Sequence, residues 1–376
     1  MKKSLLRTVV ALASVGLVGC NKESKEAEIA VVTDVGQLRD GGFNQGTYEG
    51  AKQYAEKNGK TYNYYAPANG DKATDQDRIA ARKLAIQKKA KVVVAPGFLQ
   101  ATARRSVAKE NPDVKFVFVD GWTLTDSTDA SGNDNGTALA NVTAISFKEQ
   151  ESGYLAGYGV VKDGYKKLGG TFGGGGSNPA CNRYAYGFVQ GANAAAAERS
   201  ETVERKLSYK FGSSFNASDT LKSQRAGWYA EGTEIVFSCG GSMVNSVIAA
   251  AEETTNGKVV GVDVDQRGLS NRIVTSAQKG LSVSVQLALG ERYDGKWDSK
   301  LGGKTQNLGA AENATGLPTA DESWGFKTFT KAEYQTVFDK IKNGTVTPSS
   351  DVAADCNEQS FWTKSTWQNI TVTLDK

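Results

Sequence analysis

Acidic residues close several of the apolar segments of this chain, where strands of a parallel sheet would end. Asp34, Asp120 and Asp263 each follow a short run rich in Val, Ile and Phe. In an open parallel sheet, ligands bind beyond the carboxyl ends of the strands. A carboxylate in such a position can accept two hydrogen bonds from a vicinal diol. We therefore expect these three side chains to face a binding cleft.

A polar loop follows the first of these acids and contains one aromatic ring. Asp40, Phe43 and Asn44 flank two glycines, which allow close approach of the backbone to a ligand. The loop is not GxGxxG, and no Walker A sequence occurs. The four glycines 173–176 lack the Lys and Ser/Thr of a phosphate-binding loop, so we interpret them as a flexible turn after a strand.

A lysine lies sixteen residues after the last acid of this group. The Lys279 ammonium could donate to the same hydroxyls that Asp263 binds, or to a ring oxygen. Without further information such an acid–lysine pair is usually structural. Phe43 and Phe215 would likewise be interpreted as core residues. Both alternatives remain open at this point.

The chain contains no histidine, which excludes histidine-based catalytic triads and the usual zinc sites. Cys181, Cys239 and Cys356 have no CxxC or other metal-binding spacing. One disulfide and one thiol, or three unpaired cysteines, both fit the sequence, which selects no pair. We expect no metal, no cofactor and no enzymatic activity.

The N-terminus has the pattern of a lipoprotein signal peptide. Lys2, Lys3 and Arg7 precede an apolar segment that is too short to span a bilayer, and Leu-Val-Gly precedes Cys20. A cysteine at this place is the lipidation point of lipoprotein signals. The alternative is an ordinary signal peptide with a cysteine by chance. We predict that the mature chain begins at Cys20, outside the cytoplasmic membrane and tethered to it by lipid alone.

Removal of this segment changes the charge balance. The 45 basic and 41 acidic residues become 42 and 41, a net charge of +1, so the composition gives no argument for a nucleic-acid partner. The remaining 357 residues exceed one ordinary core. Two lobes are therefore expected, and no later apolar run reaches membrane-spanning length.

Apolar runs and amphipathic segments alternate along the chain. Near-continuous Val/Ile/Phe runs separated by helical patterns indicate strands buried on both faces of a parallel sheet. We predict strands at 28–34, 62–66, 91–97, 114–121, 141–147, 167–172, 203–209, 234–239 and 258–264. We predict helices near 44–59, 71–89, 149–161, 183–199, 220–231, 243–255 and 331–343. Two doubly wound α/β lobes account for this order.

A succession of short motifs resembles one known family. The motifs are Asp40-Gly-Gly-Phe-Asn-Gln45, Lys115-Phe-Val-Phe-Val-Asp120-Gly, Glu151-Ser-Gly-Tyr-Leu-Ala-Gly157, Gly187-Phe-Val-Gln-Gly191, Gly212-Ser-Ser-Phe215-Asn, Gly261-Val-Asp263-Val-Asp265-Gln266 and Thr275-Ser-Ala-Gln-Lys279. Together they are similar to the basic membrane protein (BMP) family, the purine-nucleoside receptor lipoproteins of ABC importers. The similarity runs from about residue 29 to 343. Trp122 and the C-terminal tail depart from the family pattern.

The resemblance implies a type I periplasmic-binding-protein fold, with two lobes joined by three crossover segments around a ligand cleft. The expected organisation is signal peptide 1–19, anchor linker 20–28, first part of lobe 1 29–145, first part of lobe 2 146–257, and 258–376 completing both lobes with a C-terminal extension. In relatives a nucleobase lies between two aromatic rings, which correspond to Phe43 and Phe215. An acid and a lysine hold the ribose, here Asp263 and Lys279. The residues at or near positions that contact base or sugar are Asp34, Asp40, Asn44 and Asp120.

The implied partners are a purine nucleoside of the adenosine, guanosine and inosine class and the permease of the importer, with the receptor acting as a monomer. A sugar or a furanosyl signal is the alternative ligand. A nucleoside-processing enzyme such as a hydrolase is the alternative class of function.

Overall fold

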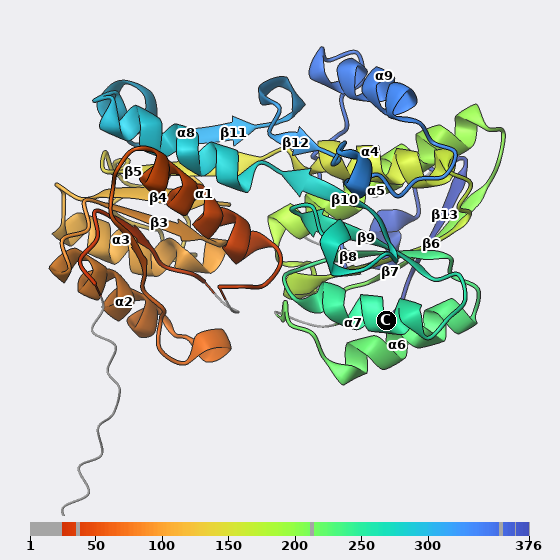
Figure 1. The fold of residues 1–376 in the computed structure, drawn as a ribbon, viewed down its shortest axis with the longest axis horizontal. Coiled ribbons are helices and arrows are strands. Elements are labelled where there is room, and N and C mark those ends of the chain that lie inside the picture. Colours follow the sequence, from red (N-terminus) through yellow and green to blue (C-terminus); the bar gives the residue numbers. More distant parts are fainter. Residues whose placement is uncertain (1–24, 35–37, 211–213, 353–355, 365, 376) are drawn as a thin grey trace, which may run out of the picture.

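The protein is described by a computed structural model, which covers residues 25–34, 38–210, 214–352, 356–364 and 366–375. These residues form two α/β lobes lying side by side (Figure 1). The predicted type I periplasmic-binding-protein fold, with two doubly wound parallel sheets, is confirmed. The predicted signal peptide and Cys20 lie outside the described residues.

Lobe 1 is built on a six-stranded sheet in the order β11-β5-β4-β3-β1-β2, and every pairing is parallel. The strands are β1 (Ile29–Val31), β2 (Tyr62–Tyr64), β3 (Val92–Pro96), β4 (Lys115–Val119), β5 (Val142–Phe147) and β11 (Thr305–Leu308). Alternate residues of a strand point to opposite faces. Ile29 and Val31 pack with α1 (Phe43–Lys57) and α8 (Leu281–Tyr293), whereas Ala30 packs with α2 (Asp75–Gln87) and α3 (Ala101–Glu110).

Lobe 2 is built on a seven-stranded sheet in the order β12-β10-β9-β8-β6-β7-β13, parallel except where β12 meets β10. The strands are β6 (Lys167–Phe172), β7 (Val203–Ser208), β8 (Ile235–Cys239), β9 (Lys258–Asp263), β10 (Ile273–Lys279), β12 (Thr315–Gly316) and β13 (Ile370–Leu374). Helices α4 (Glu149–Lys162) and α5 (Pro179–Glu198) cover one face, and α6 (Asp219–Ala230) and α7 (Met243–Glu252) cover the other.

Three crossings join the lobes. The chain passes from β5 to α4, from β10 to α8, and from β11 to β12 (Figure 1). The segment 258–376 therefore supplies β9, β10, β12 and β13 to lobe 2, and α8 and β11 to lobe 1. Between β12 and β13 come α9 (Lys331–Lys342), which begins with a Thr330–Glu333 capping box, and a short α10 (Gln359–Trp362).

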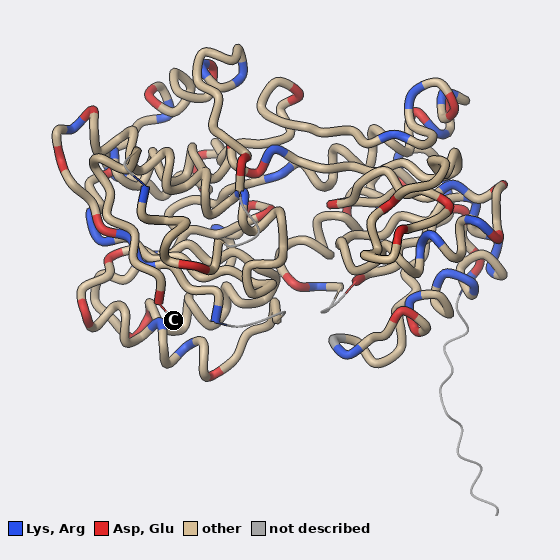
Figure 2. Tube along the Cα trace, turned by 180° about the vertical axis from the view of Figure 1, so that it is seen from behind, with Lys and Arg blue, Asp and Glu red and all other residues tan. Residues whose placement is uncertain are grey.

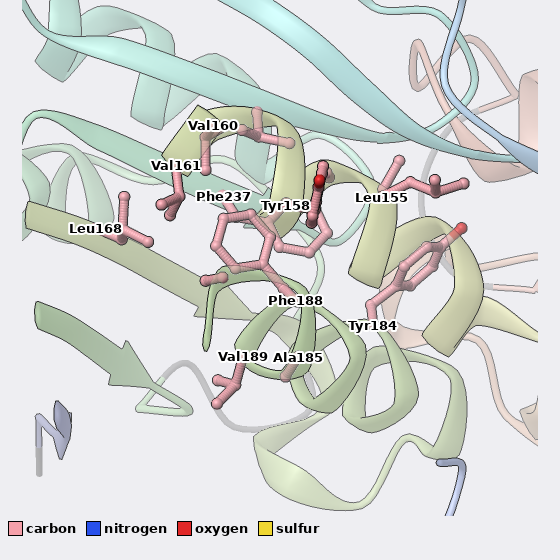
Figure 3. Packing of buried hydrophobic residues seen from close by; sticks show 14 of the residues in the cluster. Leu155, Tyr158, Val160, Val161, Leu168, Tyr184, Ala185, Phe188, Val189 and Phe237 are labelled. Carbon is pink, nitrogen blue, oxygen red and sulfur yellow. The ribbon is translucent and has the colours of Figure 1, made fainter. Parts of the chain in front are cut away.

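Two of the sequence motifs lie where α4 and α5 pack against each other. A Cβ at Gly157 would lie 2.1 Å from the carbonyl oxygen of Phe188, and a Cβ at Gly191 would lie 2.0 Å from that of Tyr154. Only glycine permits this separation of the two backbones. The core beside this contact is aromatic: Phe188 stacks on Phe237 of β8 with ring centroids 5.4 Å apart (Figure 3). The two helices are therefore held in direct backbone contact along their middle turns.

Several elements were not predicted. Strand β10 was missed because Thr275, Ser276 and Gln278 are polar, although Thr275 and Ser276 are buried. Helix α8 shows weak periodicity, with Val283 and Leu287 exposed. Strand β13 pairs with β7 and places part of the unfamiliar C-terminal tail in the lobe 2 sheet.

Charged residues of both signs are distributed over both lobes (Figure 2). No helix in the described part of the chain is long and apolar enough to cross a membrane. Within that same part, no cluster of three or more Cys, Asp or Glu residues could hold a metal ion.

Candidate functional site

One cavity of about 740 Å³ lies between the lobes, and the loops at the carboxyl ends of both sheets form its wall. All eight ligand-site residues expected from the sequence line it: Asp34, Asp40, Phe43, Asn44, Asp120, Phe215, Asp263 and Lys279. The first five belong to lobe 1 and the last three to lobe 2. The structure therefore brings together residues that are up to 245 positions apart in the sequence, as the positions Asp34 and Lys279 show.

Lys279 is the centre of a buried charge network. Its ammonium group is hydrogen-bonded to Asp120 Oδ2, and lies 3.4 Å from Asp263 Oδ1 and 3.7 Å from Glu149 Oε1. Asp120 belongs to lobe 1, whereas Lys279 and Asp263 belong to lobe 2. The network therefore spans the cleft. The simple acid–lysine pair expected from the sequence is in fact one lysine among three acids.

The positions of the two strand-end acids are held by an uncommon backbone conformation. Asp120 has φ +55° and Asp263 has φ +68°, in the left-handed region that few residues other than glycine adopt. Each residue directly follows or ends its strand, so the chain turns sharply there. Such conformations cost free energy and cluster at functional sites. The same conformation occurs at equivalent strand ends, after β4 in lobe 1 and at the end of β9 in lobe 2, which marks this part of the cleft as a candidate binding site.

Burial and charge act in opposite directions on these ionisable groups. Burial raises the pKa of Asp120 to about 6, although the ammonium group of Lys279 opposes the rise. The pKa of Asp263 is also raised by burial, with Lys279 again opposing. Burial alone would lower the pKa of Lys279, but the carboxylates of Asp120, Asp263 and Glu149 raise it. Lys279 is therefore a permanent cation at physiological pH.

The two phenylalanines present rings from opposite lobes. Phe43 is the first residue of α1 and is half-buried, with its ring centroid 4.6 Å from the Lys279 ammonium. Phe215 lies in the loop after β7 and is also half-buried. A Cβ at Gly173 would lie 2.4 Å from the Phe215 ring, and one at Gly240 would lie 3.1 Å from it. Gly173 and Gly240 leave room for the ring, so Phe215 packs against these two glycines.

Asp34 forms part of the lobe 1 wall. Its carboxylate lies 3.4 Å from Arg78, and burial raises its pKa to about 7 despite this partner. A Cβ at Gly97 would lie 2.0 Å from Asp34 Oδ2, and Gly97 has φ +99°. Gly97 is therefore required for the position of Asp34. At neutral pH the Asp34 carboxyl can both donate and accept hydrogen bonds.

Asp40 has a local structural task. Its two carboxylate oxygens accept the backbone N–H groups of Gly42, Asn44 and Gln45 at 2.9 to 3.1 Å. These groups begin α1, whose N-terminus carries unsatisfied N–H donors. Asp40 thereby fixes the first turn of the helix that presents Phe43 and Asn44 to the cavity.

Other residues at the site were not predicted. Arg183 donates from Nε to Glu149 Oε2 at 2.6 Å, and Tyr184 donates to Asp263 Oδ1 at 3.4 Å. Glu149 opens α4, where an acid is ordinarily explained by the helix dipole, so its sequence gives no sign of this role. Trp122, noted in the sequence only as a departure, also lines the cavity and donates from Nε1 to Asp134.

Residues 27–348 match the protein family described as Bmp, ABC transporter substrate-binding protein PnrA-like. The chain belongs to this family. It is an ABC transporter substrate-binding protein, and the resemblance recognised from the sequence motifs is confirmed.

Curated relatives of this Bmp protein share about a quarter of its residues. The ABC transporter nucleoside-binding protein BmpA of Lactococcus lactis is 28% identical over 330 residues, covering 79% of this chain and 87% of the relative. Basic membrane protein B of Borreliella burgdorferi is 25% identical, covering 70% and 69%. An uncharacterised lipoprotein of Pyrococcus abyssi is 26% identical, covering 91% and 80%.

Solved structures with the same fold include ABC transporter solute-binding proteins. The protein from Aeropyrum pernix has a TM-score of 0.70 at 20% identity, covering 89% of this chain and 96% of that one. The protein from Conexibacter woesei has a TM-score of 0.62 at 17% identity, covering 87% and 100%. At these identities the likeness concerns the fold alone.

Proposed function

We propose that this Bmp protein is a lipid-anchored, extracytoplasmic receptor that binds a purine nucleoside in the cleft and delivers it to an ABC permease. One observation carries the proposal. Two aromatic rings from opposite lobes, Phe43 and Phe215, line the same cavity as the network of Lys279, Asp120 and Asp263. This combination suits a ligand with one flat aromatic part and one polyhydroxylated part, which is the composition of a nucleoside.

The purine lies between Phe43 and Phe215. Aromatic side chains stack on the faces of bases, and each ring contributes about 1 to 3 kcal/mol by alanine substitution. The edge of the base faces the lobe 1 wall, where Asp34 and Asn44 supply polar groups. Because Asp34 has a pKa of about 7, it can accept from a ring N–H or donate to a ring nitrogen.

The ribose lies against the charge network. Asp263 accepts hydrogen bonds from the vicinal hydroxyls, and Lys279 donates to the same hydroxyls or to the ring oxygen. Asp120 approaches from lobe 1 and completes the ribose pocket. The left-handed backbone of Asp120 and Asp263 orients both carboxylates before the ligand arrives.

Binding then favours the closed arrangement of the lobes. The ligand contacts Phe43 and Asp120 on one side of the cleft and Phe215 and Asp263 on the other, so closure adds contacts that an open cleft lacks. The monomeric closed form is the one that docks on the permease. A lipid at Cys20 keeps the receptor at the membrane, where it meets the permease.

Two other functions would give different experimental results. A receptor for a sugar or a furanosyl signal would bind its ligand without a base, and a hydrolase would convert the nucleoside. The purified protein is denatured, and the released small molecules are identified by mass spectrometry. In parallel, guanosine is incubated with the folded protein and followed by chromatography. A released purine nucleoside and intact guanosine support the proposal, whereas a sugar ligand or free guanine contradicts it.

A further inference from the structure

Two cysteines lie next to each other in the wall of the cavity. Cys181 is in the first turn of α5, where its N–H donates to Asn178, and Cys239 is the last residue of β8. The Cys181 thiol lies 3.8 Å from the carbonyl oxygen of Cys239. Both residues line the cavity and are otherwise buried, with exposed fractions of 6% and 2%.

The third cysteine of lobe 2 has different neighbours. The Cys356 thiol lies 3.7 Å from the carbonyl oxygen of Gly176, and its side chain also contacts Tyr209. Cys356 is fully buried and is not among the residues that line the cavity. The sequence offered three possible pairs among these cysteines, and the structure distinguishes them by contact and by access.

We propose that Cys181 and Cys239 form a disulfide within the cleft when the protein meets a small thiol oxidant. Disulfides persist in oxidising compartments, which is where a secreted chain would function. The proposal concerns the protein's own thiols and does not depend on which ligand occupies the cavity.

The reaction proceeds by thiol–disulfide exchange. Cys181 is the attacking sulfur because it is the more accessible residue of the pair, with 6% exposed against 2% for Cys239. Burial also raises the pKa of the Cys239 thiol, which keeps that group protonated. The Cys181 thiolate attacks one sulfur of a small organic disulfide and releases one thiol. Cys239 then loses its proton and attacks the Cys181 sulfur, which releases the second thiol. Two protein thiols are oxidised and one organic disulfide is reduced.

The cross-link would lie beside the glycines against which Phe215 packs. Cys239 is followed by Gly240 and Gly241. A Cβ added at Gly240 would lie 3.1 Å from the Phe215 ring, and one added at Gly241 would lie 2.8 Å from the Phe215 carbonyl oxygen. Joining Cys239 to the first turn of α5 therefore fixes the segment against which Phe215 packs.

The test uses the reduced, folded, full mature chain. The folded protein is treated with 2-hydroxyethyl disulfide. It is then denatured in the presence of iodoacetamide and digested, and its cysteine peptides are assigned by mass spectrometry. We expect one linked pair, Cys181–Cys239, with Cys356 alkylated. Cys356→Ser should retain the link, whereas Cys239→Ser should carry only 2-mercaptoethanol on Cys181. Recovery of alkylated Cys181 and Cys239 from the treated wild-type protein, or a Cys181–Cys356 link, would overturn the proposal.

Discussion

Removing the Phe215 ring separates a stacking role from a core role. The ring is half-buried: one side packs on the backbone at Gly173 and Gly240, and the residue also lines the cavity. Phe215→Ala removes one of the two proposed stacking faces, at a cost of about 1 to 3 kcal/mol. This corresponds to a Kd about 5-fold to 150-fold weaker.

The same substitution should affect folding much less than a core truncation. A half-buried phenylalanine contributes roughly 1 to 2 kcal/mol of burial free energy, below the about 3 to 5 kcal/mol lost when a buried one is truncated. Phe237→Ala, in the fully buried core of the same lobe, is the matched control. It should lower the free energy of unfolding strongly and leave the affinity of the folded protein nearly unchanged.

The assay pairs calorimetric titration of guanosine or inosine with urea denaturation of the ligand-free protein. Phe43→Ala provides the equivalent test in lobe 1. If Phe215→Ala destabilised the ligand-free protein as much as Phe237→Ala but kept wild-type affinity, Phe215 would be a core residue, and the stacking argument would be refuted.

Three further predictions concern the charged groups and the anchor. Asp263→Asn retains a residue that tolerates positive φ but removes the charge, and should weaken nucleoside binding at least about tenfold in titrations. Asp265→Asn, whose side chain is held by Ser323 outside the cavity, should not change affinity. Because burial raises the Asp34 pKa from 3.8 to about 7, the contribution of Asp34 to folding stability falls as pH rises from about 4 to about 7. Asp34→Asn should remove this part of the pH dependence of the melting temperature. An unchanged pH dependence would contradict the assignment. Cys20→Ala should leave an uncleaved or soluble protein, whereas wild type partitions into detergent; a wild-type N-terminal peptide without lipid mass would exclude the anchor.

Strong local signals made most of the fold predictable from the sequence. The run Val92–Pro96 is buried at every position, so its continuous apolar character identified a central strand. Strand β10 is buried as well, but several of its side chains are polar. Ser276, for example, is fully buried although its side chain is polar. Burial of a polar strand depends on tertiary hydrogen bonds, such as that from Gln266 N–H to Ser276 Oγ, which no local pattern reveals.

The lining of the cavity was predictable where strand ends and motifs marked it. The three strand-end acids followed from position and residue type, whereas Lys279, Phe43 and Phe215 followed from the family resemblance. Glu149 could not be recognised, because its role depends on the contact of α4 with α5 that places it against Arg183. The neighbouring thiols of Cys181 and Cys239 likewise depend on the packing of a helix start against a strand end.

Calorimetric titration of the purified receptor tests the central claim most directly. Guanosine, inosine and adenosine are compared with the free base and with ribose, because only a nucleoside engages both the rings of Phe43 and Phe215 and the charge network at Lys279. We predict saturable binding at one site per chain for at least one purine nucleoside, with free base and ribose much weaker. Equal affinity for adenine and adenosine would remove the ribose role from the network, and tight binding of ribose without any nucleoside binding would contradict the account.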